Sequence, residues 1–336
     1  MLENTREGAE HPELGFRPPE VRHPKTIFEH GKARTIYMPD IHEQWVHHII
    51  IVILAPIILS TSYPYSCGSF PKRGSHYGMK YLRSKIKKGK GIKYFAKLDI
   101  RHFYNSIRVN VMLDELRQVV KDEWFIHVIE VCLRGFNKGI PLGFYISQWL
   151  ANYLLEPLDR LIMEECGISI LLRYMDDLVL MDDNKKRLHY AITASKRLIG
   201  RLRLVFKDNY QVARFIYVKK NGQTIGRPID VMGFVFYRGK VIMRKSIMLH
   251  ITRLAKKMHM VKKSTGKYRA RDARAMLSGM GWIKYTDSYD CYLAYIKPYI
   301  SIKSLKKIVS KEDKKENKER TEYDGMERGT PCAKTG

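Results

Sequence analysis

Residues 171–183 read Leu-Leu-Arg-Tyr-Met-Asp-Asp-Leu-Val-Leu-Met-Asp-Asp, so an acidic pair stands between two short apolar runs. Runs of this length are typical of buried strands, and the turn between them is expected to hold Asp176 and Asp177 at the edge of a core. Neighbouring like charges destabilise each other unless a cation lies beside them. The stretch therefore predicts either a divalent-metal site or a hairpin whose Asp-Asp turn reflects turn chemistry alone.

A second acidic pair, Asp182-Asp183, stands before Asn184 and a helical pattern with apolar residues on one side. Asp and Asn are favoured at helix N-caps. We therefore interpret this pair as a capping cluster and not as a second metal site.

The charge of the whole chain limits the classes of partner. Its 336 residues carry a formal net charge of +27, which indicates a polyanionic partner. Nucleic acid is the commonest such partner, and a membrane surface is the alternative. The most apolar run, residues 49–59, contains Pro56 and is shorter than the about 20 residues that cross a bilayer, so it predicts a buried helix. Five scattered cysteines and the lack of a signal-peptide pattern favour a reducing, cytoplasmic setting with no membrane partner.

Apolar periodicity and turn residues predict a mixed succession of helices and strands. Besides the acidic hairpin, strands are expected at residues 33–38, 94–100, 215–219, 230–237 and 241–244. Helices are expected at residues 42–53, 79–88, 109–135, 147–165 with a kink at Pro157, and across 247–308.

A third carboxylate completes a chemical unit with the acidic pair. Asp99 stands near the end of the apolar run Tyr94-Phe-Ala-Lys-Leu-Asp-Ile100. Two divalent ions about 4 Å apart need several carboxylate oxygens, and together they stabilise the attacking and leaving oxygens of a phosphoryl transfer. Mg²⁺ takes oxygen ligands and keeps several waters, so few protein ligands suffice. Asp99, Asp176 and Asp177 are therefore the candidate catalytic residues.

Two motifs resemble those of a known family. Asp99-Ile-Arg-His-Phe-Tyr104 is similar to the first catalytic motif of reverse transcriptases, and Arg173-Tyr-Met-Asp-Asp177 is similar to their metal-binding hairpin. The resemblance implies an RNA-directed DNA polymerase of the α+β class, a right hand with an antiparallel palm sheet and a helical thumb. It implies fingers at residues 31–92, a palm with fingers-associated helices at 93–245 and a helical thumb at 246–309. The polar, proline-rich residues 1–30 predict an N-terminal arm, and the charged residues 310–336, which lack apolar periodicity, predict a disordered tail.

The resemblance also implies a metal site. Two Mg²⁺ ions, for which Mn²⁺ can substitute, would bind at Asp99, Ile100, Asp176 and Asp177. Each acid is ionised near neutral pH when a cation balances its charge.

Residues that handle the nucleotide follow from the same resemblance. Lys32 and Arg34 would hold the triphosphate, a task suited to positive charge and bidentate donors. Tyr104 would exclude the ribose 2′-hydroxyl, and Lys207 would assist the leaving pyrophosphate. The alternatives are that Lys32 and Arg34 are exposed basic residues beside a strand and that Tyr104 belongs to the core.

Met232-Gly233-Phe234 resembles the primer-grip hairpin of the family. Its glycine would allow the primer to approach the backbone closely. A core strand is the alternative.

The segment at residues 139–148, Gly-Ile-Pro-Leu-Gly-Phe-Tyr-Ile-Ser-Gln, separates groups within the family. Most reverse transcriptases carry glutamine where this chain has Leu142, before Gly143, and proline where it has Gln148. The chain instead resembles the reverse transcriptases of diversity-generating retroelements. Leucine packs against a nascent base pair but forms no hydrogen bond with it, which predicts lower fidelity. The alternative is that Leu142 fills a pocket without affecting accuracy.

The thumb region is rich in basic residues, which predicts a nucleic-acid track held by phosphate contacts. These residues are Lys256, Lys257, Lys262, Lys263, Arg269 and Arg271, with Lys267 and Arg274 beside them. The implied partners are a structured noncoding template RNA, a DNA or RNA primer, deoxynucleoside triphosphates and a small basic accessory protein oligomer. Two alternatives remain, a phage-defence reverse transcriptase that copies its own noncoding RNA and a non-catalytic RNA-binding protein with the same fold.

Overall fold

The computed structural model of the protein describes residues 24–29, 32–88, 91–136 and 138–328. The chain divides into two compact units, Met1–Arg227 and Pro228–Gly336. The division falls inside the predicted palm, because the strands at residues 229–243 pair only with one another among the described strands. They therefore belong to the second unit.

The first unit is built on a five-stranded sheet with the order β3-β5-β6-β4-β7. Its strands are β3 (Ser66–Cys67), β4 (Tyr94–Asp99), β5 (Ile170–Tyr174), β6 (Asp177–Asp182) and β7 (Gln211–Arg214). The pairs β5–β6, β6–β4 and β4–β7 are antiparallel, and β3 joins β5 in parallel. The acidic hairpin and the strand that carries the third acid are thus neighbours in the middle of the sheet.

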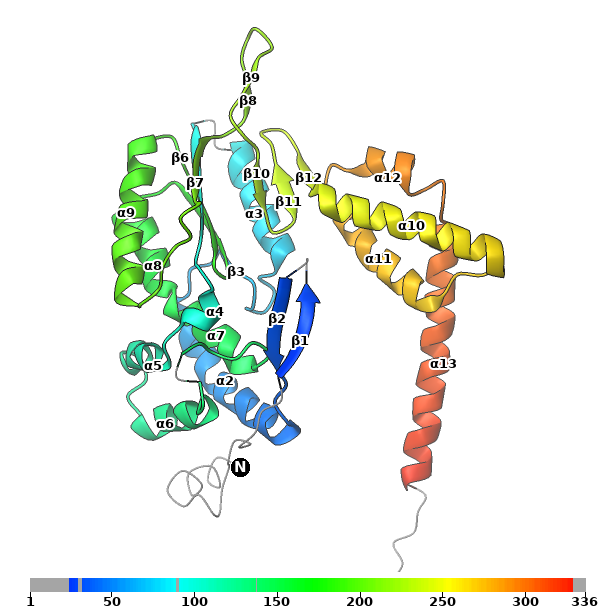
Figure 1. Ribbon diagram of the computed structural model, residues 1–336, viewed down its shortest axis with the longest axis horizontal. Helices are drawn as coiled ribbons and strands as arrows, with labels where there is room; N and C mark the ends of the chain where they lie inside the picture. Colours follow the sequence, from blue (N-terminus) through cyan, green and yellow to red (C-terminus); the bar gives the residue numbers. More distant parts are fainter. Residues whose placement is uncertain (1–23, 30–31, 89–90, 137, 329–336) are drawn as a thin grey trace, which may run out of the picture. The chain divides into compact units, whose positions relative to one another are not determined.

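Helices cover this sheet and complete the core of the first unit. They are α2 (Ile41–Thr61), α3 (Ser75–Lys88), α4 (Phe103–Ser106), α5 (Val109–Arg117), α6 (Glu123–Cys132), α7 (Tyr145–Leu154), α8 (Glu156–Arg160), the π-helix η1 (Leu161–Glu165) and α9 (Lys185–Arg201). α9 packs against β4 and β6, α3 against β3 and β5, and α2 against α7 (Figure 1). Val179 and Leu180 point to opposite faces of β6 and are both fully buried, which explains the uninterrupted apolar run.

Two predicted long helices are divided, each for a local reason. The helix expected at 109–135 separates into α5 and α6, because Asp122 caps a new helix by accepting a hydrogen bond from the Phe125 amide (3.1 Å). The helix expected at 147–165 separates into α7, α8 and η1, with Pro157 in the first turn of α8. A missing amide hydrogen is tolerated there, so Pro157 marks a new start and not a kink within one helix.

The apolar run at 49–59 is part of a longer helix than predicted. α2 has 21 residues and is the one helix of the described chain that is long and apolar enough to cross a membrane, a test that core helices also pass. Val46 and Ile50 are buried on one face, whereas Trp45 and Val52 are exposed. The expectation of a short, buried helix was therefore wrong in length and holds for one face only.

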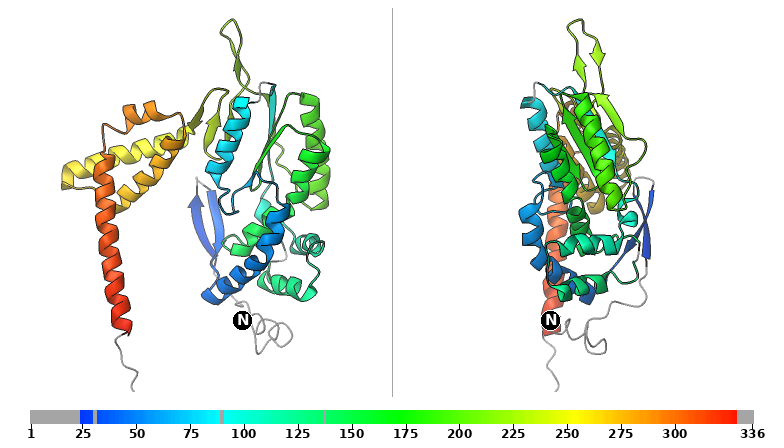
Figure 2. Two further views of the ribbon diagram at one scale, coloured as in Figure 1. Left: turned by 180° about the vertical axis from the view of Figure 1, so that it is seen from behind. Right: turned by 90° about the vertical axis from the view of Figure 1, so that its left-hand side faces the viewer.

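Two small hairpins complete the first unit. β1 (Pro24–Glu29) pairs with β2 (Lys32–Tyr37), and β8 (Tyr217–Val218) pairs with β9 (Thr224–Ile225). The β8–β9 hairpin extends beyond the five-stranded sheet in both views of Figure 2. β1 begins inside the predicted N-terminal arm, and the rest of that arm, residues 1–23, lies outside the described residues.

The second unit combines a small antiparallel sheet with helices. The sheet consists of β10 (Ile229–Val231), β11 (Phe234–Phe236) and β12 (Val241–Met243). The helices are α10 (Lys245–Thr265), α11 (Ala270–Tyr285), α12 (Tyr289–Tyr295) and α13 (Ile302–Arg328). Apolar side chains from α10, α11 and α13 form its core, as expected for a helical thumb.

Helix α13 continues into the segment predicted to be a disordered tail. Its first turns are anchored by the buried Leu305, and Arg274 of α11 forms ion pairs with Asp313 and Glu316, each at 2.8 Å. α13 continues to Arg328, which corrects the prediction of a disordered tail up to that residue. The end of the chain, residues 329–336, lies outside the described residues.

Candidate active site

The acidic hairpin is tighter than the sequence predicted. Tyr174 pairs with Asp177, so the two-residue turn consists of Met175 and Asp176, and Asp177 is the first residue of β6. Met175 has a φ of 55°, in the left-handed region that favours glycine, asparagine and aspartate. An Asp-Asp turn formed for reasons of turn chemistry is therefore excluded, because the two acids do not form the turn together.

The third carboxylate lies directly across the sheet from the pair. Asp99 is the cross-strand partner of Asp177, and the amide of the fully buried Ile100 donates to the Asp176 carbonyl oxygen (3.4 Å). Directly opposed like charges destabilise a sheet. Burial, and to a smaller extent the charges of Asp177 and Asp99, raise the pKa of Asp176 to about 6. The three predicted carboxylates thus meet at one end of β4 and β6.

Lys207 supplies a positive charge to this cluster. Its ammonium forms an ion pair with Asp99 Oδ2, and its amide donates to the Asp99 carbonyl oxygen (2.8 Å). The other carboxylate oxygen of Asp99, Oδ1, is buried and has no hydrogen-bond partner among the residues that the structure describes. A buried oxygen left in this condition is costly, and one lysine does not balance three acids.

The cluster fits a divalent cation that takes oxygen ligands. Asp99, Asp176 and Asp177 offer carboxylate oxygens, which Mg²⁺ and Mn²⁺ prefer. The unpaired Asp99 Oδ1 and the raised pKa of Asp176 mark a position where a cation would stabilise the ionised acids. Within the described ranges, no group of three or more Asp, Glu, His or Cys side chains is arranged closely enough to hold a metal ion without further ligands.

Tyr104 lies in α4 near the acidic turn. Burial raises the pKa of its hydroxyl, and the charge of Asp176 raises it further. The Ile140 amide donates to the Tyr104 carbonyl oxygen (2.9 Å), so the loop at residues 139–143 runs beside α4. The structure therefore brings the predicted ribose gate, the acidic turn and this loop together.

The same loop contacts strand β2. The Tyr37 amide donates to the Leu142 carbonyl oxygen (2.7 Å). Gly143 has a φ of 106°, and a Cβ atom there would overlap the Tyr37 carbonyl oxygen, so this position requires glycine. On β2 itself Arg34 is exposed, and the side chain of Lys32 lies outside the described part of the chain.

A buried trio behind the turn was missed by sequence reasoning. Asn152, Asp159 and Arg173 are at most 2% exposed, and Arg173 donates hydrogen bonds to both of the others. The sequence does contain one indication of this trio. Arg173 interrupts an apolar run, and an arginine buried in such a strand needs an acidic partner. Asn152 also donates to the carbonyl oxygen of Gln148 (3.1 Å), whose side chain is exposed on α7.

The second acidic pair belongs to a helix cap, as predicted. Asn184 is the N-cap of α9 and accepts a hydrogen bond from the Lys186 amide (2.9 Å). Asp182 is fully buried, accepts a hydrogen bond from Ser169 Oγ (2.9 Å) and forms an ion pair with Arg187 (3.2 Å). Asp182 therefore has partners of its own at the end of β6 opposite to the acidic cluster.

In the second unit, Met232 and Gly233 form the turn between β10 and β11, with φ values of 54° and 84°. A Cβ atom at Gly233 would lie 2.6 Å from the Trp282 ring and 2.8 Å from the Ile247 side chain. Phe234 is fully buried and packs on Trp282 (ring centroids 4.8 Å apart). The glycine is therefore needed for packing within the unit, and its role in the approach of a primer stays a prediction.

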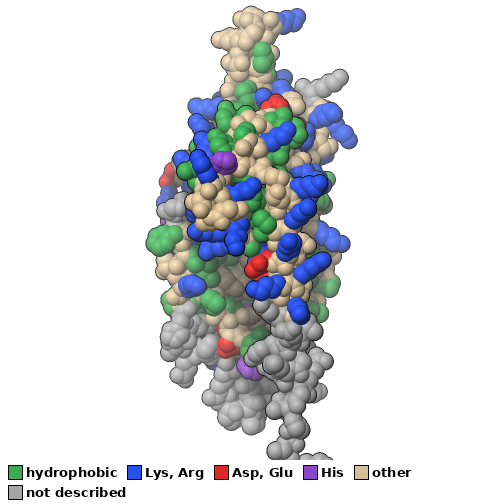
Figure 3. Space-filling view, turned by 90° about the vertical axis from the view of Figure 1, so that its right-hand side faces the viewer, with side chains coloured by type: hydrophobic (Ala, Val, Ile, Leu, Met, Phe, Trp, Pro, Cys, Tyr) green, Lys and Arg blue, Asp and Glu red, His purple; other side chains and the backbone are tan. Residues whose placement is uncertain are grey.

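The basic residues predicted to bind nucleic acid are exposed on α10 and at the start of α11. They are Lys256, Lys257, Lys262, Lys263, Arg269 and Arg271. Lys256 lies over the Tyr299 ring (5.6 Å) and Lys262 over the Tyr268 ring (5.0 Å). On the face drawn in Figure 3, Lys and Arg side chains predominate over Asp and Glu, a distribution that suits phosphate groups.

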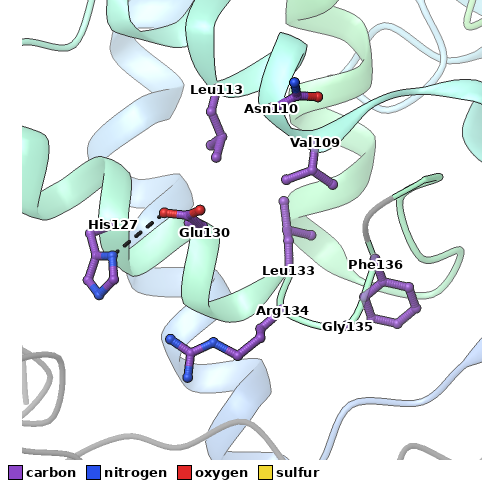
Figure 4. Close-up of a pocket in the computed structure, with 9 residues that line it drawn as sticks. All are labelled: Val109, Asn110, Leu113, His127, Glu130, Leu133, Arg134, Gly135 and Phe136. Carbon is purple, nitrogen blue, oxygen red and sulfur yellow. Dashed lines mark ion pairs between the residues drawn. The ribbon is translucent and has the colours of Figure 1, made fainter.

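A cavity of about 460 Å³ lies between α5 and α6 (Figure 4). Its lining includes Leu113, Phe136 and an ion pair between His127 and Glu130 (3.6 Å). None of the predicted site residues lines it. The cavity is therefore separate from the acidic cluster.

Comparison with known proteins identifies related sequences. The sequence model of the family described as reverse transcriptase (RNA-dependent DNA polymerase) matches residues 23–209, more than half of the chain. Protein YkfC of Escherichia coli is 20% identical over 147 residues, and nuclear intron maturase 1, mitochondrial, of Arabidopsis thaliana is 28% identical over 113 residues. These matches cover 40% and 33% of this chain but 38% and 16% of the relatives, so the chain spans well under half of their lengths.

The fold is similar to that of Candida tropicalis telomerase. The apo structure gives a TM-score of 0.51 at 14% identity, covering 79% of this chain and 52% of the telomerase chain. The structure in complex with the TWJ fragment of telomeric RNA gives a TM-score of 0.50 at 11% identity, covering 81% and 54%. At such low identity the likeness concerns the fold, which is that of a right-hand polymerase.

Proposed function

The chain belongs to the reverse transcriptase family, and on this premise we propose that it is an RNA-directed DNA polymerase. The acidic cluster carries the proposal. Asp99 and Asp177 oppose each other across the sheet, and Asp176 beside them has a raised pKa. Acids placed in this way attract divalent cations, which nucleotidyl transfer needs.

In the proposed reaction, the three acids hold Mg²⁺ while ionised. When bound, the metal ions act as Lewis acids on the attacking and leaving oxygens. Lys207, which is ion-paired with Asp99, places a proton and a positive charge next to the leaving pyrophosphate.

The nucleotide is proposed to bind between β2 and α4. Lys32 and Arg34 on β2 contribute positive charge to the triphosphate. The ring of Tyr104 occupies the space that a ribose 2′-hydroxyl needs, which favours deoxynucleotides. The loop with Leu142 links these elements through the Tyr37 hydrogen bond.

Template RNA and primer are proposed to bind through phosphate contacts with the basic residues of α10 and α11. Such contacts do not depend on sequence, so the RNA is recognised mainly by its shape and backbone.

Primer extension on an RNA template tests the proposed activity. The Asp176→Ala/Asp177→Ala variant is expected to lose Mg²⁺-dependent extension by at least about 10³-fold while it keeps RNA binding. Asp183→Ala, at the other end of β6, is the matched control and should extend like the wild type. Extension by the double variant at the wild-type rate would remove this site from the reaction.

We further infer an error-prone enzyme that serves mutagenic retrohoming in a diversity-generating retroelement. Leu142 and Gln148 support this role by their resemblance to that group. The partners would be a structured noncoding RNA and a small basic accessory protein oligomer. A leucine beside the nascent base pair lacks the hydrogen bond that rejects wrong geometry.

Sequencing of the cDNA tests this role. Errors concentrated at template adenines are expected, with fewer errors in a Leu142→Gln variant. Uniformly accurate cDNA from the wild type would contradict the role and favour an enzyme that makes cDNA from its own noncoding RNA in phage defence.

A further inference from the structure

A buried ion pair lies directly behind the metal-binding turn. The Arg173 guanidinium and the Asp159 carboxylate are 1% and 0% exposed. Arg173 Nε donates to both carboxylate oxygens, Oδ1 (2.8 Å) and Oδ2 (3.0 Å), and Nη2 donates to Oδ2 (2.7 Å). Such a pair adds little stability compared with apolar residues of the same volume, because both charges lose their hydration. Its value therefore lies in what else the arginine contacts.

The remaining donors of Arg173 reach the turn and α7. Nη1 donates to Asn152 Oδ1 (2.9 Å) and to the carbonyl oxygen of Met175 (3.2 Å). Nη2 also donates to the Asn152 carbonyl oxygen (3.3 Å). One planar side chain thus connects α8, α7 and the residue immediately before Asp176.

Asn152 contacts the same turn from α7. Its amide nitrogen donates to Met175 Sδ (3.4 Å) and to the Gln148 carbonyl oxygen (3.1 Å). Met175 Sδ also accepts a hydrogen bond from Ser69 Oγ (3.1 Å), and a Cβ atom at Gly68 would lie 2.6 Å from this sulfur. The side chain of Met175 is therefore enclosed by the loop after β3 on one side and by α7 on the other.

Met175 needs such support because its φ is 55°. A residue other than glycine persists in this conformation only when its surroundings determine it. A rotation at Met175 would move Asp176 and Asp177 relative to Asp99, since the two acids follow it directly. Contacts that fix Met175 therefore also fix the spacing of the three carboxylates.

We propose that Asn152 and Arg173 are positioning residues that hold the Met175 turn against α7 and thereby set the affinity of the acidic cluster for its divalent cation. Neither residue touches the reacting atoms. The inference rests on the proposed function, because it takes the cluster to be the metal site of that reaction. It predicts that metal binding depends on side chains buried behind the sheet.

The main test is an electron paramagnetic resonance titration with Mn²⁺ alone, on the full chain without nucleic acid or nucleotide. Asn152→Ala removes one acceptor of Arg173 and one donor to Met175 but leaves the Arg173–Asp159 pair intact. Removing a group that orients metal ligands weakens metal binding by about 10- to 100-fold. We expect the Mn²⁺ dissociation constant to rise by about 10-fold, with a matching rise in the Mg²⁺ concentration needed for extension.

Arg187→Met is the control for a purely structural effect. It breaks the ion pair with the buried Asp182 at the opposite end of the same hairpin and does not touch the turn. We expect this variant to unfold at a lower temperature with an unchanged Mn²⁺ affinity. An equal loss of Mn²⁺ affinity in both variants would overturn the proposal, and so would an unchanged affinity in Asn152→Ala.

A second variant covers the case in which Asn152→Ala does not fold. Arg173→Met/Asp159→Leu replaces the pair by apolar side chains, a change that folded proteins generally tolerate. It should also bind Mn²⁺ about 10-fold more weakly, and wild-type affinity would overturn the proposal. A wild-type protein that binds Mn²⁺ but extends no primer on RNA would refute the proposed function and not the positioning role. The differences in Mn²⁺ affinity among the variants would still test the positioning role.

Discussion

At the scale of single residues, Asp176 is an acid of the candidate site whose ionisation the fold disfavours. Burial and the neighbouring Asp177 and Asp99 raise its pKa from 3.8 to about 6. Without metal, the folded protein therefore binds a proton at Asp176 more tightly than the unfolded chain does. The contribution of Asp176 to the free energy of unfolding is therefore most favourable at low pH, and it is lost as the pH rises from about 4 through about 6.

Asp176→Asn is expected to stabilise the metal-free protein at pH 7.5. A carboxyl pKa raised from 3.8 to about 6 corresponds to roughly 3 kcal/mol in the free energy of unfolding, which is an upper bound for the gain. The gain should disappear toward pH 4, where both states are protonated, and should shrink when Mg²⁺ is added. Urea unfolding at several pH values in EDTA measures it, with Asp183→Asn as the control. A gain that is absent at pH 7.5, or largest at pH 4, would contradict this account.

Tyr104 offers a test of nucleotide selection. Tyr104→Ala removes the ring near Asp176 and should lower the preference for deoxynucleotides, measured as a ratio of kcat/KM values, by at least about 10-fold, since steric pockets discriminate on this scale. Tyr104→Phe keeps the ring and should keep the preference. Strict rejection of ribonucleotides by the alanine variant would remove the gate role.

At the scale of elements, the loop at residues 139–143 joins β2 to α4 and α7. Its contact with β2 depends on a glycine, because any larger residue at Gly143 meets the Tyr37 carbonyl oxygen. The loop therefore connects β2 to the helix that carries Tyr104, beside the acidic cluster.

Gly143→Ala should disturb nucleotide binding before it disturbs the fold. The added methyl displaces β2 from the loop, so the KM for deoxynucleotides should rise by about 10-fold or more, with a smaller change in kcat. Gly74→Ala is the matched control, because a Cβ atom there meets nothing within 4 Å. Equal kinetics for the Gly143→Ala variant and the wild type would show that this contact is not needed.

The elements differ in how well the sequence predicts them. The β5–β6 hairpin and β4 were predictable because continuous apolar runs mark strands buried on both faces. The turn was placed one residue too late, because nothing local indicates that Met175 adopts a positive φ; its support comes from Asn152 and Arg173. The packing role of Gly233 depends on Trp282, a contact far along the chain that periodicity does not reveal.

At the scale of the whole molecule, the second unit exposes a group of lysines and arginines on α10 and at the start of α11. Two of these lysines, Lys256 and Lys262, lie over tyrosine rings. The charge predicted a nucleic-acid partner from composition alone. The division into units at Arg227 was not predictable in the same way, because it depends on which strands pair.

Salt dependence measures the contribution of this surface. Replacement of Lys256, Lys257, Lys262 and Lys263 by glutamine should weaken RNA binding at all sequences. The slope of log affinity against log salt should become shallower by up to about 3, given about 0.7 counterions released per contact with a single strand. Lys185→Gln/Lys186→Gln, on exposed positions of α9, should leave the slope nearly unchanged. A slope that is the same in the fourfold variant would place the nucleic acid elsewhere.

The most direct test of the acidic cluster as a polymerase site is single-turnover extension of a primer on an RNA template across a Mg²⁺ titration, with wild-type protein and Asp99→Asn. The variant keeps the shape of the side chain and removes its charge, so RNA binding should persist. The account predicts Mg²⁺-dependent extension by the wild type and a rate at least about 10³-fold lower for the variant. Equal rates for the two proteins, or no RNA-templated extension by the wild type at any Mg²⁺ concentration, would contradict it.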